Sequence, residues 1–395
     1  MTPHPTGRMN WTLLALAIGA FGIGVTEFSP MGLLPVIAEG VDVSIPTAGL
    51  LVSAYAVGVM IGAPVMTLLF GRFGRRGALM ALMGIFTLGN ILSALAPDYW
   101  TLLLSRIVTS LNHGAFFGLG AVVAASVVRP ERRASAVATM FMGLTIANIG
   151  GVPLATWVGQ QIGWRMAFAG TAALGLVAIA ALGLALPKGL SGTRPEVRRE
   201  LRVLIRPEVL AALLTTVLGA SAMFTLYTYV APLLESLTQA SGRFVTLALV
   251  VIGLGFSIGN WLGGRLADWS LDGATAMFLA LLAAIMLAMP FAIGTQAGAL
   301  IVLLLWGAAA FAIVPPVQMR VMQAAHEAPG LASSINIGAF NLGNAIGAAA
   351  GGAVIGLGLG YAAVPVAGGI LAAAGLALVW LGRRQAAGSI ACNAG

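Results

Sequence analysis

Charged residues are scarce in this chain. Only 8% of its 395 residues are Asp, Glu, Lys or Arg, against 59% hydrophobic residues, whereas a soluble domain carries about a quarter charged residues. This shortage excludes an ordinary soluble protein and predicts an all-α polytopic membrane protein. The net charge of +8 would suggest nucleic acid only if the positions of the charges were ignored, and we expect no nucleic-acid partner.

Cysteine and the common catalytic patterns are also lacking. The single Cys392 lies in the C-terminal tail, which excludes a disulfide framework, and no spacing of potential ligands is typical of a metal site. No phosphate-binding loop ending in Gly-Lys-Ser/Thr follows a strand-like segment, which excludes ATP-driven transport within this chain. No nucleophile–base constellation is present. We therefore expect no enzymatic activity, no cofactor and no metal.

Long apolar runs are what the chain has instead. About twelve of them are long enough to cross a bilayer. With the N-terminus inside, nearly all of the 20 basic residues fall in cytoplasmic connections, as the positive-inside rule requires, so both termini are expected in the cytoplasm. The expected spans are residues 11–36, 46–69, 77–96, 100–127, 134–159, 165–187, 208–231, 244–266, 274–294, 298–319, 331–356 and 361–382.

The chain divides into two similar halves. Residues 188–207 form the only long hydrophilic segment, which predicts a cytoplasmic linker between a six-helix bundle at 1–187 and a second at 208–395. Ala134-Ser135 opens the fifth expected span and Ala332-Ser333 the eleventh, an offset of about half the chain. Two halves in the same orientation predict a pseudo-two-fold axis along the membrane normal, as in transporters built from parallel repeats.

Four stretches resemble the major facilitator superfamily, in particular its twelve-span drug/proton antiporter branch with bacterial sugar-efflux (arabinose-efflux type) and chloramphenicol-efflux proteins. Gly71–Arg76 resembles the superfamily loop signature, with glycine in place of its acid. Arg106–Gly118 is similar to the fourth-span motif of the sugar-efflux group, Gly143–Pro153 to the fifth-span antiporter motif, and Gly163–Phe168 to the opening of span six. The resemblance implies a bacterial inner-membrane location, a working monomer, and a cavity lined by spans 1, 4, 7 and 10.

Glu27 is the one acidic residue of twelve that falls well inside an expected span. A charged carboxylate is disfavoured there, so this group suits proton coupling, although a structural hydrogen-bonding role is the alternative. Arg106 is the one clearly intramembrane base, and both residues lie roughly 10 Å below the outer surface. We expect an ion pair between them that protonation or substrate breaks. The alternative is that Arg106 snorkels to the outer headgroups or braces backbone carbonyls.

Further polar and aromatic residues are candidates for the cavity. His113 shares a helix face with Arg106 and could relay protons or bind substrate, or simply be a satisfied hydrogen-bonding residue. Neutral amides and aromatics suit an uncharged solute, although each could equally be packing between helices. The candidate substrate-binding residues, besides Glu27 and His113, are Asn112, Phe117, Asn148, Phe224, Tyr227, Asn336 and Asn341.

Two regions are candidates for gating. The signature-like loop contributes Arg72, Arg75 and Arg76, and Pro153 would bend the fifth span. Asp268, at the cytoplasmic end of span eight, could face the start of span five near Ala134, where the helix dipole favours an anion. That contact would hold the cytoplasmic side shut.

These observations predict a secondary active transporter that exports a small neutral or amphipathic compound, a drug or a sugar-like molecule, in exchange for protons by alternating access. Its partners would be that solute, protons and the lipid bilayer. Uptake by proton symport is an alternative that uses the same acid. A sensor or channel that does not transport is a more distant one.

Overall fold

The structure is a computed structural model that describes residues 10–43, 45–189 and 202–393. Every regular element within these ranges is helical. Twelve helical segments of the described residues are long and apolar enough to cross a membrane, which confirms the expected all-α fold and its twelve spans. Most of the predicted linker at 188–207 lies outside the described residues, as do its charged residues from 190 to 201.

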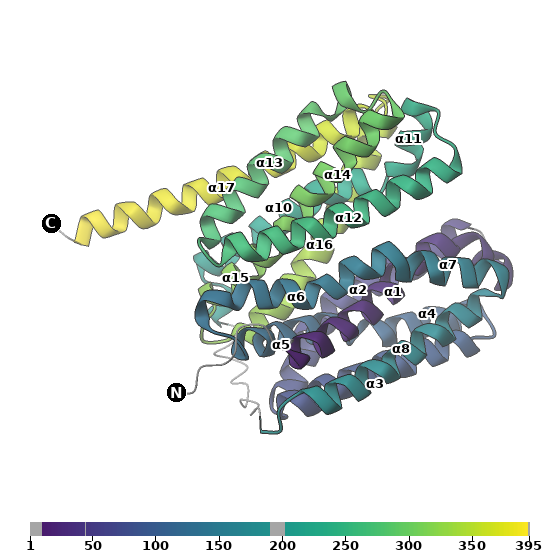
Figure 1. The fold of residues 1–395 in the computed structure, drawn as a ribbon, viewed down its shortest axis with the longest axis horizontal. Coiled ribbons are helices and arrows are strands. Elements are labelled where there is room, and N and C mark those ends of the chain that lie inside the picture. Colours follow the sequence, from purple (N-terminus) through teal and green to yellow (C-terminus); the bar gives the residue numbers. More distant parts are fainter. Residues whose placement is uncertain (1–9, 44, 190–201, 394–395) are drawn as a thin grey trace.

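The helices gather into two bundles that lie side by side (Figure 1). We call them the N-bundle and the C-bundle. The N-bundle consists of α1 (Trp11–Gly40), α2 (Ile45–Gly71), α3 (Arg75–Leu95), α4 (Tyr99–Ser110), α5 (His113–Ser126), η1 (Pro130–Arg132), α6 (Arg133–Ile146), η2 (Ala147–Gly151), α7 (Val152–Gln161) and α8 (Trp164–Ala185). The C-bundle consists of α10 (Pro207–Tyr227), α11 (Val230–Thr238), α12 (Gly242–Ala267), α13 (Leu271–Ala292), α14 (Gln296–Ala312), α15 (Val314–Ala324), α16 (Pro329–Gly356) and α17 (Ala363–Asn393).

Local sequence explains several helix boundaries. Asn10 caps α1 through its side chain, and Asp98 accepts a 2.9 Å hydrogen bond from the backbone N–H of Thr101 at the start of α4. Such caps satisfy N–H groups that have no partner within the helix. Gly163 joins α7 to α8 with a φ of 128°, a conformation that glycine adopts without steric strain.

Several spans are interrupted near their middle. Span four breaks at Leu111 and Asn112, between α4 and α5, and span ten breaks at Ile313, between α14 and α15. Span five carries a π-helical segment, η2, directly before Pro153 in α7. The missing N–H of a proline disturbs the regular helix, so the predicted disturbance of span five is present and takes the form of a π-helical turn.

Close helix packing in the C-bundle depends on glycine. A Cβ at Gly259 of α12 would overlap the backbone of Ala308 in α14, whereas a Cβ at Gly84 of α3 would meet no atom within 4 Å. Gly259→Ala should therefore destabilise the protein by about 1–3 kcal/mol, the usual range for overpacking. Thermal unfolding in detergent would measure this. Gly84→Ala is the matched control and should unfold at or slightly above the wild-type temperature, and equal effects of the two would contradict the packing argument.

Candidate functional site

A narrow cavity lies between the two bundles. The volume that the centre of a water molecule can reach in this cavity is about 30 Å³, which is room for about two water molecules. A drug-sized ligand needs a pocket of about 300 Å³ or more, so the cavity is contracted in this conformation. Its lining comes from both bundles and consists of Glu27, Phe28, His113, Phe117, Phe141, Leu144 and Asn148 of the N-bundle and Thr216, Met223, Tyr227, Phe256, Phe311, Val314, Val317, Gln318, Asn336, Ile337, Phe340 and Asn341 of the C-bundle.

Glu27, the acidic residue inside the first span, lies in α1 and lines this cavity. Its side chain is partly exposed, while the preceding Thr26 is fully buried within the N-bundle. Among the described residues, Glu27 has no ion pair within 4.0 Å, so the expected ion pair with Arg106 is not formed in this conformation. The carboxyl therefore faces the cavity without a cationic partner in contact.

Arg106 is held inside the N-bundle instead. Its side chain is 1% exposed, and Nη1 donates a 3.2 Å hydrogen bond to the hydroxyl of Thr26. The guanidinium lies 4.4 Å from the ring centre of Tyr55 and 5.8 Å from that of Phe168, within the range of cation–π attraction. Nε and Nη2 have no hydrogen-bond partner in the described part of the chain. The arginine thus neither snorkels to headgroups nor pairs with Glu27, and it retains two unused donors.

His113 begins α5, directly after the break in span four. Its Nδ1 lies 3.1 Å from the hydroxyl of Tyr55, and its ring packs at 5.2 Å against Phe117. Phe117 in turn stacks on Phe141 at 4.9 Å and 13°. The expected position of His113 in the cavity agrees with the structure. Tyr55 was not predicted, although it is the one tyrosine in the expected span 46–69.

A chain of neutral hydrogen bonds occupies the C-bundle side. The Thr216 hydroxyl donates to Asn336 Oδ1 at 2.6 Å, and Asn336 Nδ2 donates to Gln318 Oε1 at 2.5 Å. Gln318 Nε2 then donates to the Ser333 hydroxyl. Gln318 was missed by the sequence analysis, although it is the one strongly polar side chain in the apolar run 298–319. Because each amide both accepts and donates in this chain, the hydrogen bonds fix the orientation of both amides.

Three other predicted residues also line the cavity. Asn148 donates to the carbonyl of Leu144 at 3.0 Å, and the Tyr227 hydroxyl reaches Asn148 Oδ1 at 3.5 Å across the two bundles. Asn341 donates to the carbonyl of Ile337 at 3.0 Å. Both amides thus use their N–H groups on their own helix, which directs their oxygen atoms to other partners.

Two predicted substrate-binding residues lie elsewhere. Asn112 is fully buried at the break in span four, and its Nδ2 faces the sulfur of Met83 at 3.9 Å. Phe224 is buried against Phe340 and Tyr227, with ring centres 5.6 and 6.2 Å away. Neither is part of the cavity lining. Their assignment to substrate binding stays a prediction, since helix spacing alone does not say which face of an apolar helix meets the cavity.

Asp268 makes the contact that the sequence predicted for it. One carboxylate oxygen accepts a 2.9 Å hydrogen bond from the backbone N–H of Ala134, and the other accepts one at 3.3 Å from the N–H of Ser135. The Ser135 hydroxyl also donates to this carboxylate. The C-bundle thereby caps the N-terminal end of α6 with an anion, a position that the helix dipole favours.

This contact starts a seam between α6–η2 and α12. Cross-bundle pairs follow in order along the two helices: Asn260 Nδ2 with the Ala138 carbonyl at 2.6 Å, the hydroxyls of Ser257 and Thr145 at 3.0 Å, and Gly253 with Ile149. At the opposite end, α7 and α11 form no hydrogen bond with the other bundle among the described residues. In Figure 1 the bundles meet near α15 and α5 and lie farther apart near α7 and α11. The protein is therefore closed at the Asp268 end.

Arg72 and Arg76, two of the arginines predicted for gating, contact their own bundle. Arg76 donates to the carbonyl of Gly183 in α8, and the Arg72 guanidinium lies 4.9 Å from the ring centre of Phe73. Neither contact crosses the seam. Pro153 is exposed on α7 and stands outside the seam as well. The contacts of Arg72 and Arg76 thus give no direct closure in this conformation.

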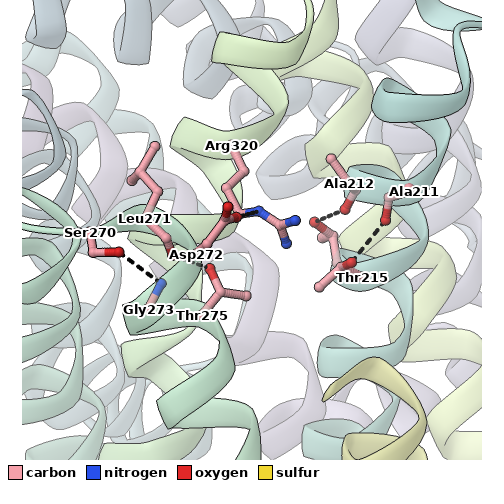
Figure 2. Close-up of polar contacts among 10 residues, drawn as sticks. Ala211, Ala212, Thr215, Ser270, Leu271, Asp272, Gly273, Thr275 and Arg320 are labelled. Carbon is pink, nitrogen blue, oxygen red and sulfur yellow. Dashed lines mark hydrogen bonds and ion pairs between the residues drawn. The ribbon is translucent and has the colours of Figure 1, made fainter. Parts of the chain in front are cut away.

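An arginine–carboxylate pair lies near Asp268 but inside the C-bundle. Arg320 Nε is 2.8 Å from Asp272 Oδ1, and Figure 2 shows the arginine of α15 reaching toward the first turn of α13, where Ser270 caps the helix through Gly273. On the other side of Arg320 lies α10, in which the Thr215 hydroxyl donates a hydrogen bond to the Ala211 carbonyl. This pair ties α15 to α13 and does not bridge the two bundles.

Two helical bundles thus meet at one end and enclose a cavity whose described lining has one carboxyl, that of Glu27. The sequence matches the Major Facilitator Superfamily over residues 16–348, so the chain belongs to that family. It is 68% identical over 378 residues to the "Inner membrane transport protein YdhP" of Escherichia coli K12, covering 96% of this chain and 97% of that protein. It is 32% identical to the "Probable sugar efflux transporter" of Helicobacter pylori, covering 93% of this chain and 94% of that protein.

Solved structures share the fold. The proton:xylose symporter XylE superposes with a TM-score of 0.76 at 16% identity, covering 94% of both chains. The Escherichia coli fucose:proton symporter FucP gives a TM-score of 0.75 at 14% identity, covering 94% of this chain and 99% of that one. The protein is thus a transporter of this superfamily by sequence, with its fold confirmed by structure.

Proposed function

We propose that the protein exports a small neutral or amphipathic compound, a drug or a sugar-like molecule, in exchange for protons. The observation that carries this proposal is Glu27, a carboxyl that faces the cavity between the bundles without an ion-pair partner in contact. A group in that position can take up and release a proton as the cavity changes side. The names of the relatives support transport, and one of them supports sugar efflux.

The distribution of polar groups favours an uncharged solute. Glu27 and Arg106 belong to the N-bundle, whereas the C-bundle side of the cavity offers hydroxyl and amide groups between aromatic rings. Apolar walls with a few placed polar groups are typical of sites for small organic ligands. An anionic solute would have to be desolvated against this lining without a cation in contact.

The closed seam suggests which state the structure represents. With the orientation that the basic residues predict, the Asp268 end is cytoplasmic, so this conformation is closed to the cytoplasm. Glu27 would then exchange its proton with the outside, and the ion pair with Arg106 would belong to another conformation. Opening of the seam would release the proton inward and admit the solute from the cytoplasm.

Transport in liposomes tests the proposal. Purified protein would be given an imposed pH gradient and a panel of chloramphenicol, ethidium, arabinose and lactose. One proton moving down a gradient of one pH unit supplies about 1.4 kcal/mol, which supports about a tenfold solute gradient. We expect solute to move against the direction of the protons. Movement in the same direction would instead establish uptake by symport, and no response of any member to the gradient would refute proton coupling for this panel.

A further inference from the structure

We propose that Tyr55 fixes His113 as the neutral tautomer with its proton on Nε2, so that His113 serves as a hydrogen-bond donor to an acceptor oxygen of an uncharged solute. The solute part rests on the function proposed above. The tautomer part concerns the protein alone. In this assignment His113 does not carry the coupled proton, and Glu27 is left as the group that does.

The direction of one hydrogen bond carries the first step. The Tyr55 hydroxyl and His113 Nδ1 are 3.1 Å apart, and Tyr55 is 2% exposed. Its hydroxyl has no other hydrogen bond in the described part of the chain. If Nδ1–H were the donor, the hydroxyl hydrogen would be buried without an acceptor, which is unfavourable. The hydroxyl therefore donates to Nδ1, and the ring proton resides on Nε2.

Burial and a neighbouring cation oppose a second proton on the imidazole. The Arg106 guanidinium of α4 lies 4.4 Å from the Tyr55 ring centre, so an imidazolium would add a cation beside a buried one. Of the other titratable groups that face the cavity, Glu27 of α1 and Tyr227 of α10, neither has a hydrogen bond or ion pair with His113 among the described residues. A protonated Nδ1 would also point its N–H at the hydroxyl that now donates to it.

The ring is held in place, so the free nitrogen has a definite position. His113 packs between Tyr55 and Phe117, with ring centres 5.9 and 5.2 Å away. Since Nδ1 is engaged by Tyr55 and His113 lines the cavity, Nε2–H is the ring group left for a solute. Asn336, Gln318 and Asn341 each use an amide N–H within the C-bundle. His113 adds a ring N–H donor on the N-bundle side of the cavity, opposite those amides.

Nitrogen NMR of the full-length protein in nanodiscs tests the tautomer. The chain has three histidines, so His4→Gln with His326→Gln leaves His113 as the single labelled imidazole. We expect a protonated Nε2 and a bare Nδ1 throughout about pH 6 to 8. A protonated Nδ1, as the other tautomer or as imidazolium, would overturn the proposal.

Tyr55→Phe should allow both neutral tautomers of His113. The substitution removes the hydroxyl that donates to Nδ1 and keeps the ring beside Arg106. We expect signals of the Nδ1–H form to appear in this variant. Tyr99→Phe is the matched control, since the Tyr99 hydroxyl donates to the Thr47 carbonyl elsewhere in the N-bundle, and it should leave the spectrum unchanged. If His113 keeps its proton on Nε2 alone in Tyr55→Phe, then Tyr55 does not fix the tautomer, and that part of the proposal is refuted.

Binding of chloramphenicol and arabinose to the nanodisc protein tests the solute part. A glutamine amide reaches about as far as Nε2, and an asparagine amide only about as far as Nδ1. We expect His113→Gln to keep binding within a few-fold of wild type and His113→Asn to weaken it about tenfold. Equal or reversed effects would refute the donor role. The spectrum is recorded without solute, so its outcome is independent of whether transport proves to be proton-driven.

Discussion

Glu27→Gln is expected to abolish proton-driven accumulation while solute exchange continues. Glutamine keeps the shape and polarity of the side chain but cannot release a proton. The cavity can therefore still bind solute and open to either side of the membrane. With a gradient of one pH unit, the accumulation ratio should fall from about ten to about one. Transport driven by the gradient and exchange of labelled against unlabelled solute would be measured in the same liposomes.

Glu39→Gln is the matched control for this result. Glu39 lies near the end of the same helix and is exposed, so the substitution removes an equal charge away from the cavity. It should leave both activities at the wild-type level. If gradient-driven transport survives Glu27→Gln, the proton is carried by another group. Loss of exchange as well would assign Glu27 to substrate binding.

Asp268→Asn is expected to shift the protein toward a state that is open at the Asp268 end. The carboxylate accepts hydrogen bonds from two backbone N–H groups and one hydroxyl of α6. Asparagine has one acceptor oxygen and would turn N–H groups toward N–H groups. Hydrogen bonds to a charged group contribute about 1.5–3 kcal/mol, so the ratio of open to closed protein should rise by about tenfold or more.

Distance measurements between two spin labels would report this shift. Cys392 is the only native cysteine and would be replaced by serine, and labels would be placed at the exposed positions Arg72 and Gln323, one in each bundle. Asp272→Asn is the control, because its ion pair with Arg320 lies within the C-bundle (Figure 2). An unchanged distance distribution and unchanged transport in Asp268→Asn would exclude Asp268 from gating.

The sequence predicted the structure best where a charged residue interrupts a long apolar run, because such residues are rare inside a membrane. Twelve apolar runs predicted the fold, because the thickness of the bilayer sets the length of a spanning helix. A carboxyl inside one run predicted a cavity group, because a charge in contact with lipid is costly. The contact of Asp268 with α6 followed from the internal repeat. The orientation of side chains on fully apolar helices did not follow, since such helices have no polar face to mark the cavity. This is why the sequence did not indicate that Asn112 and Phe224 lie outside the lining of the cavity.

Tyr55 and Gln318 were missed for a related reason. Each stands alone in an apolar run and becomes informative only through a partner distant in sequence, His113 for Tyr55 and Asn336 for Gln318. Arg106 shows a further limit. Its charge predicted a partner, and Glu27 was the nearest candidate, yet the aromatic face of Tyr55 and the hydroxyl of Thr26 hold it instead. Aromatic rings compete for a guanidinium and leave no charge pattern in the sequence.

The small side chains of the seam have a thermal consequence. Ser257 and Gly264 of α12 meet Thr145 and Ala138 of α6, so separating these parts of the two helices brings little apolar surface into water. Heat capacity rises with newly hydrated apolar area. The opening of this seam should therefore add little heat capacity, and its equilibrium constant should follow a nearly straight van't Hoff line over the growth range of a bacterium.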